Sequence, residues 1–297
     1  MIIAETFADV RAAASGVVGL APTMGYLHEG HLALFQAARD ATDTVVASIF
    51  VNALQFGPAD DLSRYPRDLE RDRDLAVRSG VDVLFVPPVE EMYLEPPRTR
   101  IEMDGLTEHF EGAFRPGHFE GVAIVVAKLL AGIQPDRAFF GRKDAQQLAV
   151  VRRLAFDLSF PVEIVPVSTV READGLALSS RNRFLSPDQR RLALAPSGAL
   201  MAAADEAESG EHDGPALESI VRRTAAELGP LQLEYAALAG ADTAQPLPIL
   251  DRDAFLAVAA TVGETRLIDN VAFSVADGIV TADRGERLTG PSVLEDD

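Results

Sequence analysis

Two of the five histidines in this chain, His28 and His31, stand three residues apart in the segment 22–31, which reads PTMGYLHEGH. Residues 17–20 form an apolar run that predicts a buried strand, and residues 32–38 predict a helix. The histidines therefore fall on a strand-to-helix turn, where this spacing brings both imidazoles to one side. A helix N-terminus attracts anions, and two imidazoles beside it can stabilise the negative charge that develops on a phosphate in a transition state. The pattern predicts nucleotide chemistry.

The same spacing has less specific interpretations. His-x-x-His is also half of a metal site, or two surface residues that happen to be neighbours. The helix of a zinc protease requires His-Glu-x-x-His, and here Glu29 and His31 stand one position too close together. The histidine pair alone therefore leaves a phosphate site, a metal half-site and a surface pair open.

Composition narrows the class of protein. With 297 residues and 47% hydrophobic residues, the chain can form one large domain or two smaller ones with a full core. Cysteine is absent, which excludes disulfides and thiolate catalysis, and no apolar run is long enough for a membrane span. There is no signal-peptide pattern at the N-terminus, so we expect a cytoplasmic protein. The net charge of −19 argues against nucleic acid as a partner.

An anionic ligand must then be held by a local positive group, against the mean field of the protein. Lys128 and Lys143 are the only lysines in the sequence. Lys143 stands in Gly-Arg-Lys-Asp, directly after the predicted strand 137–140. We interpret it as a phosphate-binding residue, although a solvated surface lysine is the simpler alternative.

Apolar strands and helices alternate along the first part of the chain. This alternation predicts an α/β fold with a Rossmann-like, doubly wound parallel sheet, whose ligands bind beyond the carboxyl ends of the strands. The polar turn at 52–58 and the segment 141–144 both follow predicted strands. Beyond the first strand and helix, the predicted strands are 44–51, 81–86, 137–140 and 162–170, and the predicted helices are 69–79, 122–132 and 145–156.

A domain boundary is expected near Arg183. Ser186 to Gln189 read as a helix start, with a serine cap, proline in the first turn and glutamine at the third position. We expect the alanine-rich segment that follows to form an exposed helix and loop. Three short strand candidates, at 231–238, 255–261 and 265–268, indicate a small α+β domain. The expected domains are thus 1–183, a Rossmann-like domain with the candidate nucleotide site, and 184–297, a small α+β lid.

Several motifs together resemble the pantothenate synthetases, the pantoate–β-alanine ligases. They are PTMGYLHEGHL, SIFVNALQFGP, YPRDLERD, FRPGHFEGVAIVVAKLL, FFGRKDAQQL and GLALSSRN, in the order and spacing of that family, and they cover most of residues 17–185. The rest is similar through LEYAALAG and RLIDNVAF. The resemblance implies a His-x-Gly-His nucleotidyltransferase fold and a homodimer. It also implies synthesis of pantothenate from pantoate, β-alanine and ATP through a pantoyl adenylate, with release of pyrophosphate and AMP.

The resemblance also implies functions for individual residues. His31, with His28 beside it and Lys143, would be catalytic. Gln55 and Gln147 would bind pantoate, Gln55 would also bind β-alanine, and Asp72 would lie near Mg²⁺ that accompanies ATP. The ATP-binding residues would be Met24, Gly25, Tyr26, Leu27, His28, Glu29, Gly30, His31, Gly141, Arg142, Lys143, Asp144, Val170, Leu178, Ser179, Ser180 and Arg181.

Each of these assignments has a structural alternative. Asp72 lies in a segment so charged that a solvated helix face explains it equally well, and Ser179 to Arg181 can be an ordinary interdomain turn. Asn52, Val125 and Val126 are expected to line the pantoate pocket, although the valines are equally compatible with helix core. Arg115 and His118 belong to a family motif, but no function follows for them.

The chain departs from the family pattern at three positions. Ala53, Arg142 and Ala145 stand where the family usually has proline, glutamate and an aromatic residue. None of these changes removes a proposed ligand, but the pocket could admit another small carboxylic acid. Two alternatives therefore remain: a nucleotidyltransferase that leaves AMP on its product, and a non-catalytic ATP-binding relative. The paired glutamines argue against the first, and the presence of the proposed cationic ligands argues against the second.

Overall fold

The computed structural model describes residues 1–57, 62 and 65–294. Contacts divide the chain into two compact units. The first unit comprises Met1–Phe140 and Val150–Val167, and the second comprises Gly141–Ala149 and Ser168–Asp297.

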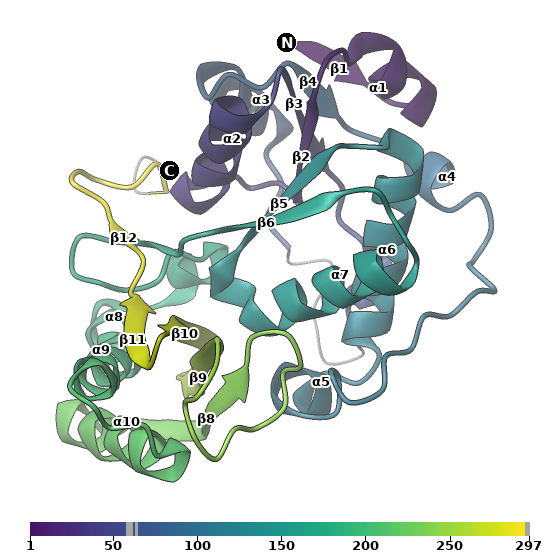
Figure 1. Ribbon diagram of the computed structural model, residues 1–297. Helices are drawn as coiled ribbons and strands as arrows, with labels where there is room; N and C mark the ends of the chain where they lie inside the picture. Colours follow the sequence, from purple (N-terminus) through teal and green to yellow (C-terminus); the bar gives the residue numbers. More distant parts are fainter. Residues whose placement is uncertain (58–61, 63–64, 295–297) are drawn as a thin grey trace. The chain divides into compact units, whose positions relative to one another are not determined.

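The first unit is built on a six-stranded sheet with the order β1-β4-β3-β2-β5-β6 (Figure 1). The pairs β1·β4, β4·β3, β3·β2 and β2·β5 run parallel. The strands are β1 (Ile2–Ala4), β2 (Val18–Thr23), β3 (Thr44–Ile49), β4 (Val83–Phe85), β5 (Arg137–Gly141) and β6 (Glu163–Val167). This confirms the predicted α/β sheet and adds β1, which the sequence analysis missed.

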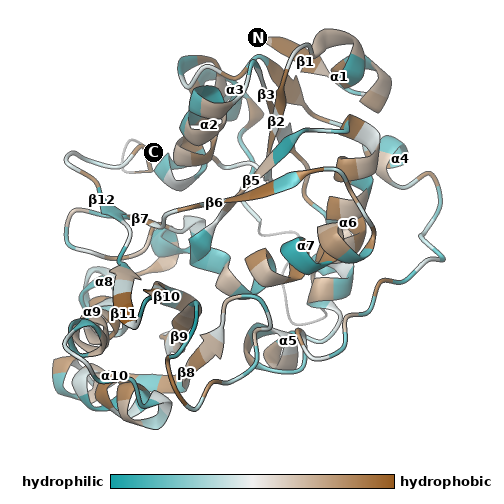
Figure 2. Ribbon diagram, viewed as in Figure 1, coloured by the Kyte–Doolittle hydropathy of each residue, from teal (hydrophilic) through white to brown (hydrophobic). Residues whose placement is uncertain are grey.

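Helices connect these parallel strands. They are α1 (Phe7–Ala13), α2 (Glu29–Ala41), α3 (Leu69–Arg78), α4 (Val89–Met92), α5 (Phe110–Phe114), α6 (His118–Ile133) and α7 (Ala145–Asp157). In Figure 2, β2 and β3 are coloured brown over most of their length, as expected for strands covered on both faces. Val45, Val46 and Ala47 of β3 are completely buried. No helix of the described residues is long and apolar enough to cross a membrane.

The order of the strands determines where a ligand can bind. From β2 the chain proceeds to β3 and β4 on one side, and it then returns to form β5 on the other side of β2. In open α/β sheets, ligands bind outside the carboxyl ends of the strands at such a switch point. The strand β2 leads into the turn with His28 and His31, and β5 leads into Gly141 to Asp144.

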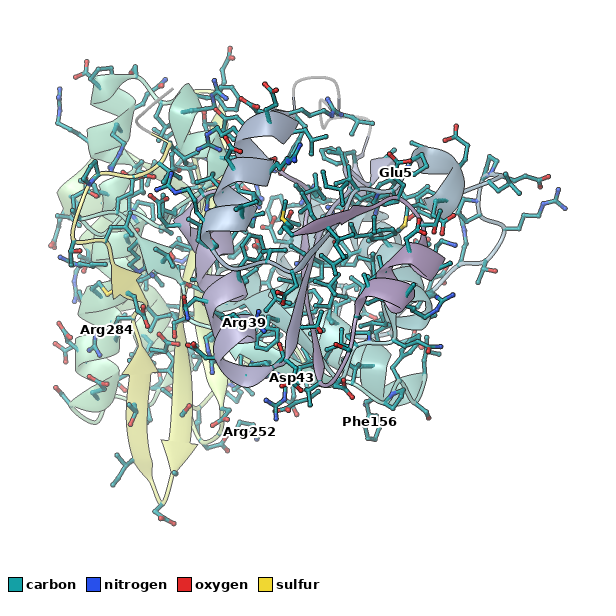
Figure 3. The ribbon with its side chains drawn as sticks, turned by 90° about the horizontal axis from the view of Figure 1, so that it is seen from above. Glu5, Arg39, Asp43, Phe156, Arg252 and Arg284 are labelled. Atoms are coloured by element: carbon teal, nitrogen blue, oxygen red, sulfur yellow. The ribbon has the colours of Figure 1, made fainter. Side chains whose placement is uncertain are left out.

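The end of α2 is tied to the sheet by Arg39. Its guanidinium donates to Asp82 Oδ2 at 2.7 Å and to the carbonyl oxygens of Thr42 and Asp43 at 2.9 and 2.6 Å. Figure 3 labels Arg39 and Asp43, which lie close together at this end of the helix. These bonds fix α2, whose other end carries the two histidines.

The second unit has an antiparallel sheet with the order β11-β10-β9-β8. Its strands are β8 (Gln232–Gly240), β9 (Ala254–Val262), β10 (Thr265–Ala276) and β11 (Ile279–Asp283), and its α-helices are α8 (Pro187–Leu192), α9 (Leu194–Glu208) and α10 (Gly214–Leu228). The three predicted strands are confirmed in longer form, and β11 was missed. The capping box of Ser186 and Gln189 at α8 is confirmed.

The interpretation of the alanine-rich segment as exposed was wrong. It forms α9, in which Ala199, Ala203, Ala204 and Ala207 are completely buried. They pack in one core with α10 and the sheet strands β8 to β10. Small side chains let the two helices and the sheet approach closely, so low side-chain volume here indicates tight packing rather than exposure.

The boundary between the two units also differs from the one expected at residue 183, because residues 141–149 and 168–183 belong to the second unit. The predicted strand 162–170 is interrupted, and β7 (Val170–Arg171) pairs with β12 (Glu286–Arg287) rather than with the six-stranded sheet. Residues 141–149 and 168–183 therefore have their contacts in the second unit. The functional division into a substrate domain and a lid stays a prediction.

Candidate functional site

The two histidines form a cap at the start of α2. His28 is the N-cap residue, and its Nδ1 accepts a hydrogen bond from the backbone N–H of Gly30 at 3.2 Å. The Nδ1 of His31 accepts from the backbone N–H of His28, also at 3.2 Å. The ring centroids are 4.1 Å apart. The helix therefore begins with Glu29, earlier than the apolar pattern predicted, and both imidazoles stand on its first turn.

This cap determines which nitrogen of each ring carries the proton. A backbone N–H can only donate, so Nδ1 of both His28 and His31 must be the acceptor. A neutral imidazole then carries its proton on Nε2. The two Nε2–H groups are donors of the kind that an anionic oxygen needs, placed at a helix N-terminus whose dipole also favours negative charge.

The turn before the histidines is held by Asp72 from α3. Gly25 and Tyr26 have φ values of +82° and +52°, which the side chain of Tyr26 tolerates poorly. The carboxylate of Asp72 accepts from the backbone N–H groups of Tyr26 and Leu27, each at 2.7 Å. Arg71 donates to the carbonyl oxygen of Leu27 at 2.9 Å, and its guanidinium lies 5.3 Å from the centroid of the Tyr26 ring. The start of α3 thus clamps the strained turn.

The structure gives Asp72 a role other than the metal ligand suggested by the resemblance. Its side chain is 2% exposed, and each of its oxygens already accepts a backbone hydrogen bond. Burial raises the pKa of Asp72 above its ordinary value, and the two backbone donors and Arg71 offset part of that rise. Within the described ranges, no group of three or more His, Asp or Glu residues could hold a metal ion. Buried and bonded in this way, Asp72 does not fit a direct ligand of magnesium.

The turn after β3 carries Gln55 on the 3₁₀ helix η1 (Ala53–Gln55). Its side-chain oxygen accepts from Nδ2 of Asn52 at 3.0 Å, and its Nε2 lies 3.1 Å from the thioether sulfur of Met24. A thioether is a weak acceptor that a substrate carboxylate or hydroxyl can replace. The amide of Gln55 is thereby oriented with its donor end toward Met24. The predicted polar turn reached to Pro58, which lies outside the described residues.

Asn52 is itself held at several points. It is 1% exposed, its Nδ2 also donates to the carbonyl oxygen of Gly121, and its Oδ1 accepts from the hydroxyl of Tyr93 at 3.0 Å. Burial raises the pKa of Tyr93, so the hydroxyl stays protonated and remains a donor. The ammonium nitrogen of Lys128 lies 5.9 Å from the centroid of the Tyr93 ring, within the range of a cation–π interaction. A buried polar chain therefore supports Gln55.

The second unit contains a recess that brings several of the predicted phosphate ligands together. Lys143, on the 3₁₀ turn η3 (Arg142–Asp144), lines it together with Ser179, Arg181 and Asn182. The other wall is the start of β10, with Arg266 to Asp269. The side chain of Lys143 is 19% exposed, so this lysine is not a solvated surface residue.

The turn that carries Lys143 is fixed by Asn270 of β10. The side-chain nitrogen of Asn270 donates to the carbonyl oxygens of Arg142 and Lys143, at 2.9 and 2.8 Å. Next to it, the carboxylate of Asp269 accepts from Arg171 at 2.6 and 3.0 Å and from Ser197 at 2.6 Å. A buried, fully hydrogen-bonded ion pair therefore lies at the wall of the recess.

Other predicted residues lie differently. Arg142 forms an ion pair with Asp283 at 3.2 Å, so its charge is largely balanced. Leu178 is 1% exposed, and its backbone N–H donates to the carbonyl oxygen of Val170. The residues that line the recess do not include Arg142, Leu178 or Ser180. Ser180 begins the 3₁₀ helix η4 (Ser180–Phe184).

The remaining candidates belong to helices. Gln147 lies on the first part of α7, in the second unit, whereas Gln55 belongs to the first unit. Asp144 has its carboxylate 3.9 Å from the nitrogen of Lys143. Val125 and Val126 are 7% and 4% exposed on α6, which fits the helix-core alternative.

Sequence reasoning missed the residues that hold the candidate binding side chains in place. Asn270 was visible only as part of the motif RLIDNVAF, and Tyr93 carried no signal at all. Their functions depend on hydrogen bonds between segments far apart in the chain, which no local pattern encodes.

Comparison with known proteins identifies the family. The family model for pantoate–β-alanine ligase matches residues 2–272. The chain is 52% identical to the pantothenate synthetase of Moorella thermoacetica over 260 residues, which covers 88% of this chain and 92% of that protein. The crystal structure of pantothenate synthetase from Thermus thermophilus matches with a TM-score of 0.85 at 51% identity, covering 91% of this chain and 98% of that one.

A further solved structure adds ligands. The pantoate–β-alanine ligase of Francisella tularensis, described as complexed with β,γ-ATP and β-alanine, matches with a TM-score of 0.74 at 33% identity. The match covers 91% of this chain and 97% of that one. The chain described here belongs to the pantoate–β-alanine ligase family.

Proposed function

We propose that this protein joins pantoate to β-alanine with ATP, in two steps. A carboxylate oxygen of pantoate attacks the α-phosphorus of ATP, which forms a pantoyl adenylate and releases pyrophosphate. The amine of β-alanine then attacks the acyl carbon, AMP leaves with the electrons of the broken C–O bond, and the amine loses a proton. The products are pantothenate, AMP and pyrophosphate.

The observation that carries this proposal is the capped histidine pair. Because Nδ1 of His28 and of His31 accepts a hydrogen bond of the cap, each neutral ring carries its proton on Nε2, an atom that can donate to a phosphate oxygen. Negative charge on those oxygens rises as the carboxylate attacks, and preorganised donors stabilise this transition state more than the ground state. His31 is assigned the larger catalytic effect, and His28 acts beside it.

The other ligands follow from the resemblance and from the hydrogen bonds described above. Lys143, with Ser179 and Arg181 in the same recess, holds the phosphates as charged and neutral donors. Gln55 and Gln147 bind pantoate, and Gln55 also binds β-alanine. Magnesium enters as part of the nucleotide substrate, with phosphate oxygens as its ligands.

The two units then act on one substrate set. We propose that the second unit closes as a lid over ATP and excludes water from the adenylate, which water would hydrolyse. The working form is proposed to be a homodimer in the cytoplasm, where ATP is plentiful. Hydrogen exchange with and without a non-hydrolysable ATP analogue tests the closure, because it requires slower exchange in segment 175–183.

The reaction itself is tested by incubating the protein with Mg–ATP, pantoate and β-alanine. We expect AMP and pantothenate to accumulate in equal amounts. Formation of ADP would contradict adenylate chemistry, and a product that retains AMP would favour the alternative nucleotidyltransferase. Replacing pantoate with other small carboxylic acids tests whether the pocket near Ala53 admits a different substrate; a better substrate among them would replace pantoate in the proposal.

A further inference from the structure

The start of α6 lies directly against the backbone of Gln55. His118, the first residue of this helix, is 8% exposed, and its Nδ1 lies 2.8 Å from the carbonyl oxygen of Gln55. Its Nε2 lies 3.2 Å from Nη1 of Arg115. A side chain at Gly121 would put its Cβ 2.3 Å from the carbonyl oxygen of Leu54, so α6 and η1 can approach this closely only with glycine there.

The partners of His118 determine its tautomer. A carbonyl oxygen can only accept, so Nδ1 must carry a proton and donate to Gln55. A guanidinium can only donate, so Nε2 must be unprotonated and accept from Arg115. This is the opposite of the tautomer that the α2 cap requires of His28 and His31. Arg115 thereby keeps the imidazole in the one form that can bond the Gln55 backbone.

We propose that His118, fixed in the Nδ1–H tautomer by Arg115, is a positioning residue that holds Gln55 for the hydroxy-acid substrate. This inference rests on the proposed function, in which Gln55 binds pantoate. It assigns functions to two residues of the FRPGHF motif that the sequence left without one.

The hydrogen bonds around Gln55 explain why its backbone matters. Asn52 accepts from the backbone N–H of Gln55 at 3.3 Å and donates to its side-chain oxygen at 3.0 Å. His118 donates to the backbone carbonyl oxygen of Gln55 and so fixes the orientation of its peptide group. With these three bonds made, the amide nitrogen near Met24 is the end presented to a ligand. A rotated peptide at Gln55 would turn that donor away, and small misplacements of such groups weaken binding and turnover.

A pair of variants of matched size tests the donor. In His118→Asn, the side-chain nitrogen stands as many bonds from the backbone as Nδ1 of histidine and can donate to Gln55. His118→Leu has nearly the same shape as asparagine and no donor. We expect His118→Leu to raise the pantoate KM roughly three- to tenfold, the effect of one lost hydrogen bond, and His118→Asn to stay within about twofold of the original protein. The ATP KM should move less than about twofold in both.

A change confined to pantoate, and relieved by asparagine, separates positioning from general damage to the fold. Circular dichroism at the assay temperature confirms that both variants are folded. Equal pantoate KM values for the leucine and asparagine variants would overturn the proposal, and so would an equal rise in the KM of ATP.

Arg115→Met tests the role of the guanidinium. Without it, only the carbonyl oxygen of Gln55 still favours the Nδ1–H tautomer of His118, so the pantoate KM should rise by about two- to fivefold. In the His118→Asn background, the same change should have no further effect on the pantoate KM, because asparagine has no tautomer to fix. Independent, multiplicative effects of the two substitutions would contradict a tautomer held by Arg115.

A spectroscopic measurement tests the tautomer without any substrate. In ¹⁵N-labelled protein, long-range ¹H–¹⁵N spectra assigned with the His118 variants should show Nδ1 protonated and Nε2 unprotonated. The reverse pattern would overturn the inference whether or not the protein makes pantothenate. If the original protein makes no pantothenate, the proposed function fails; if it does and the variants behave alike, only this inference fails.

Discussion

The residues of the proposed site divide into those assigned to meet a ligand and those that hold these residues in place. At the start of α2, each histidine caps the helix with Nδ1 and carries its proton on Nε2. One substitution therefore removes both a cap and a ligand, and the two losses must be separated by experiment.

His31→Ala should reduce single-turnover adenylate formation by roughly a hundred- to a thousandfold, because it removes a preorganised donor worth about 2.7–4 kcal/mol in the transition state. The ATP dissociation constant, measured by calorimetry, should change little. Lys143→Ala should weaken ATP binding as well, since its charge meets phosphates before the reaction begins. His109→Ala, distant in sequence from both segments, serves as the control. Near-normal turnover in His31→Ala would show that the site is misplaced.

Asp72 is expected to act on the turn and not on magnesium. Asp72→Ala leaves the backbone N–H groups of Tyr26 and Leu27 without an acceptor, at a cost of about 2–4 kcal/mol of unfolding free energy in urea. Asp72→Asn keeps one acceptor and should lose about half as much. In the asparagine variant, the magnesium concentration for half-maximal activity should be unchanged. A marked increase in that concentration would restore Asp72 as a metal ligand.

At the scale of the elements, side chains on one segment fix turns on another. Asn270 of β10 holds the carbonyl groups of the turn with Lys143, and Asp72 of α3 holds the turn before α2. These hydrogen bonds hold Lys143 and the two histidines more firmly than their turns could by themselves.

Asn270→Ala should raise the ATP KM by about three- to tenfold, because two backbone carbonyls of η3 lose their donor and Lys143 loses its fixed position. Asn270→Asp is the matched variant: it keeps the size but places an acceptor against two acceptors, so it should be at least as damaging. The pantoate KM should stay near its original value in both. An aspartate variant with the original ATP KM would contradict the role given to this side chain.

The link between α9 and β11 predicts a pH dependence of stability. Hydrogen bonds from Arg284 (labelled in Figure 3) and from the backbone of Ala282 lower the pKa of Glu208 below its ordinary value of 4.5. A lowered pKa in the folded state stabilises the protein above the unfolded pKa, and that stabilisation is lost as the pH falls through the folded pKa. Because the pair is partly exposed, Glu208→Gln should cost only about 0.5 kcal/mol in urea unfolding at pH 7. The difference should shrink as the pH falls below that ordinary value and through the lowered pKa of the folded state, and a constant difference would exclude the charge as its cause.

Strands and helices with strong apolar patterns were predictable from the sequence. The short strands β1 and β11, the burial of α9 and the helices α1, α4, α5 and α10 were not. The strand β1 has only three residues, too few for a pattern, and β11 is a short strand with alternating exposure at the edge of its sheet. The alanines of α9 carried no hydrophobic signal strong enough to indicate burial. Sequence motifs identified His31, Lys143 and Gln55 as candidates. The roles of Asn270 and His118 depend on hydrogen bonds to segments far away in the sequence, which only the structure shows.

At the scale of the whole molecule, each unit carries part of the proposed chemistry. The first unit holds the histidine pair and Gln55, and the second holds Lys143 with Ser179 and Arg181. A reaction in two steps suits this division, because the adenylate must persist on the protein until the amine arrives. The order of the steps is therefore the central claim.

Exchange of labelled pyrophosphate into ATP tests that order most directly. The reaction mixture contains the protein, Mg–ATP, pantoate and labelled pyrophosphate, with no β-alanine. If pantoate is adenylated before the amine binds, label should enter ATP, and omitting pantoate should abolish the exchange. His31→Ala should slow the exchange by roughly a hundred- to a thousandfold. Exchange that requires β-alanine would contradict a pantoyl adenylate intermediate, and with it the mechanism proposed for this protein.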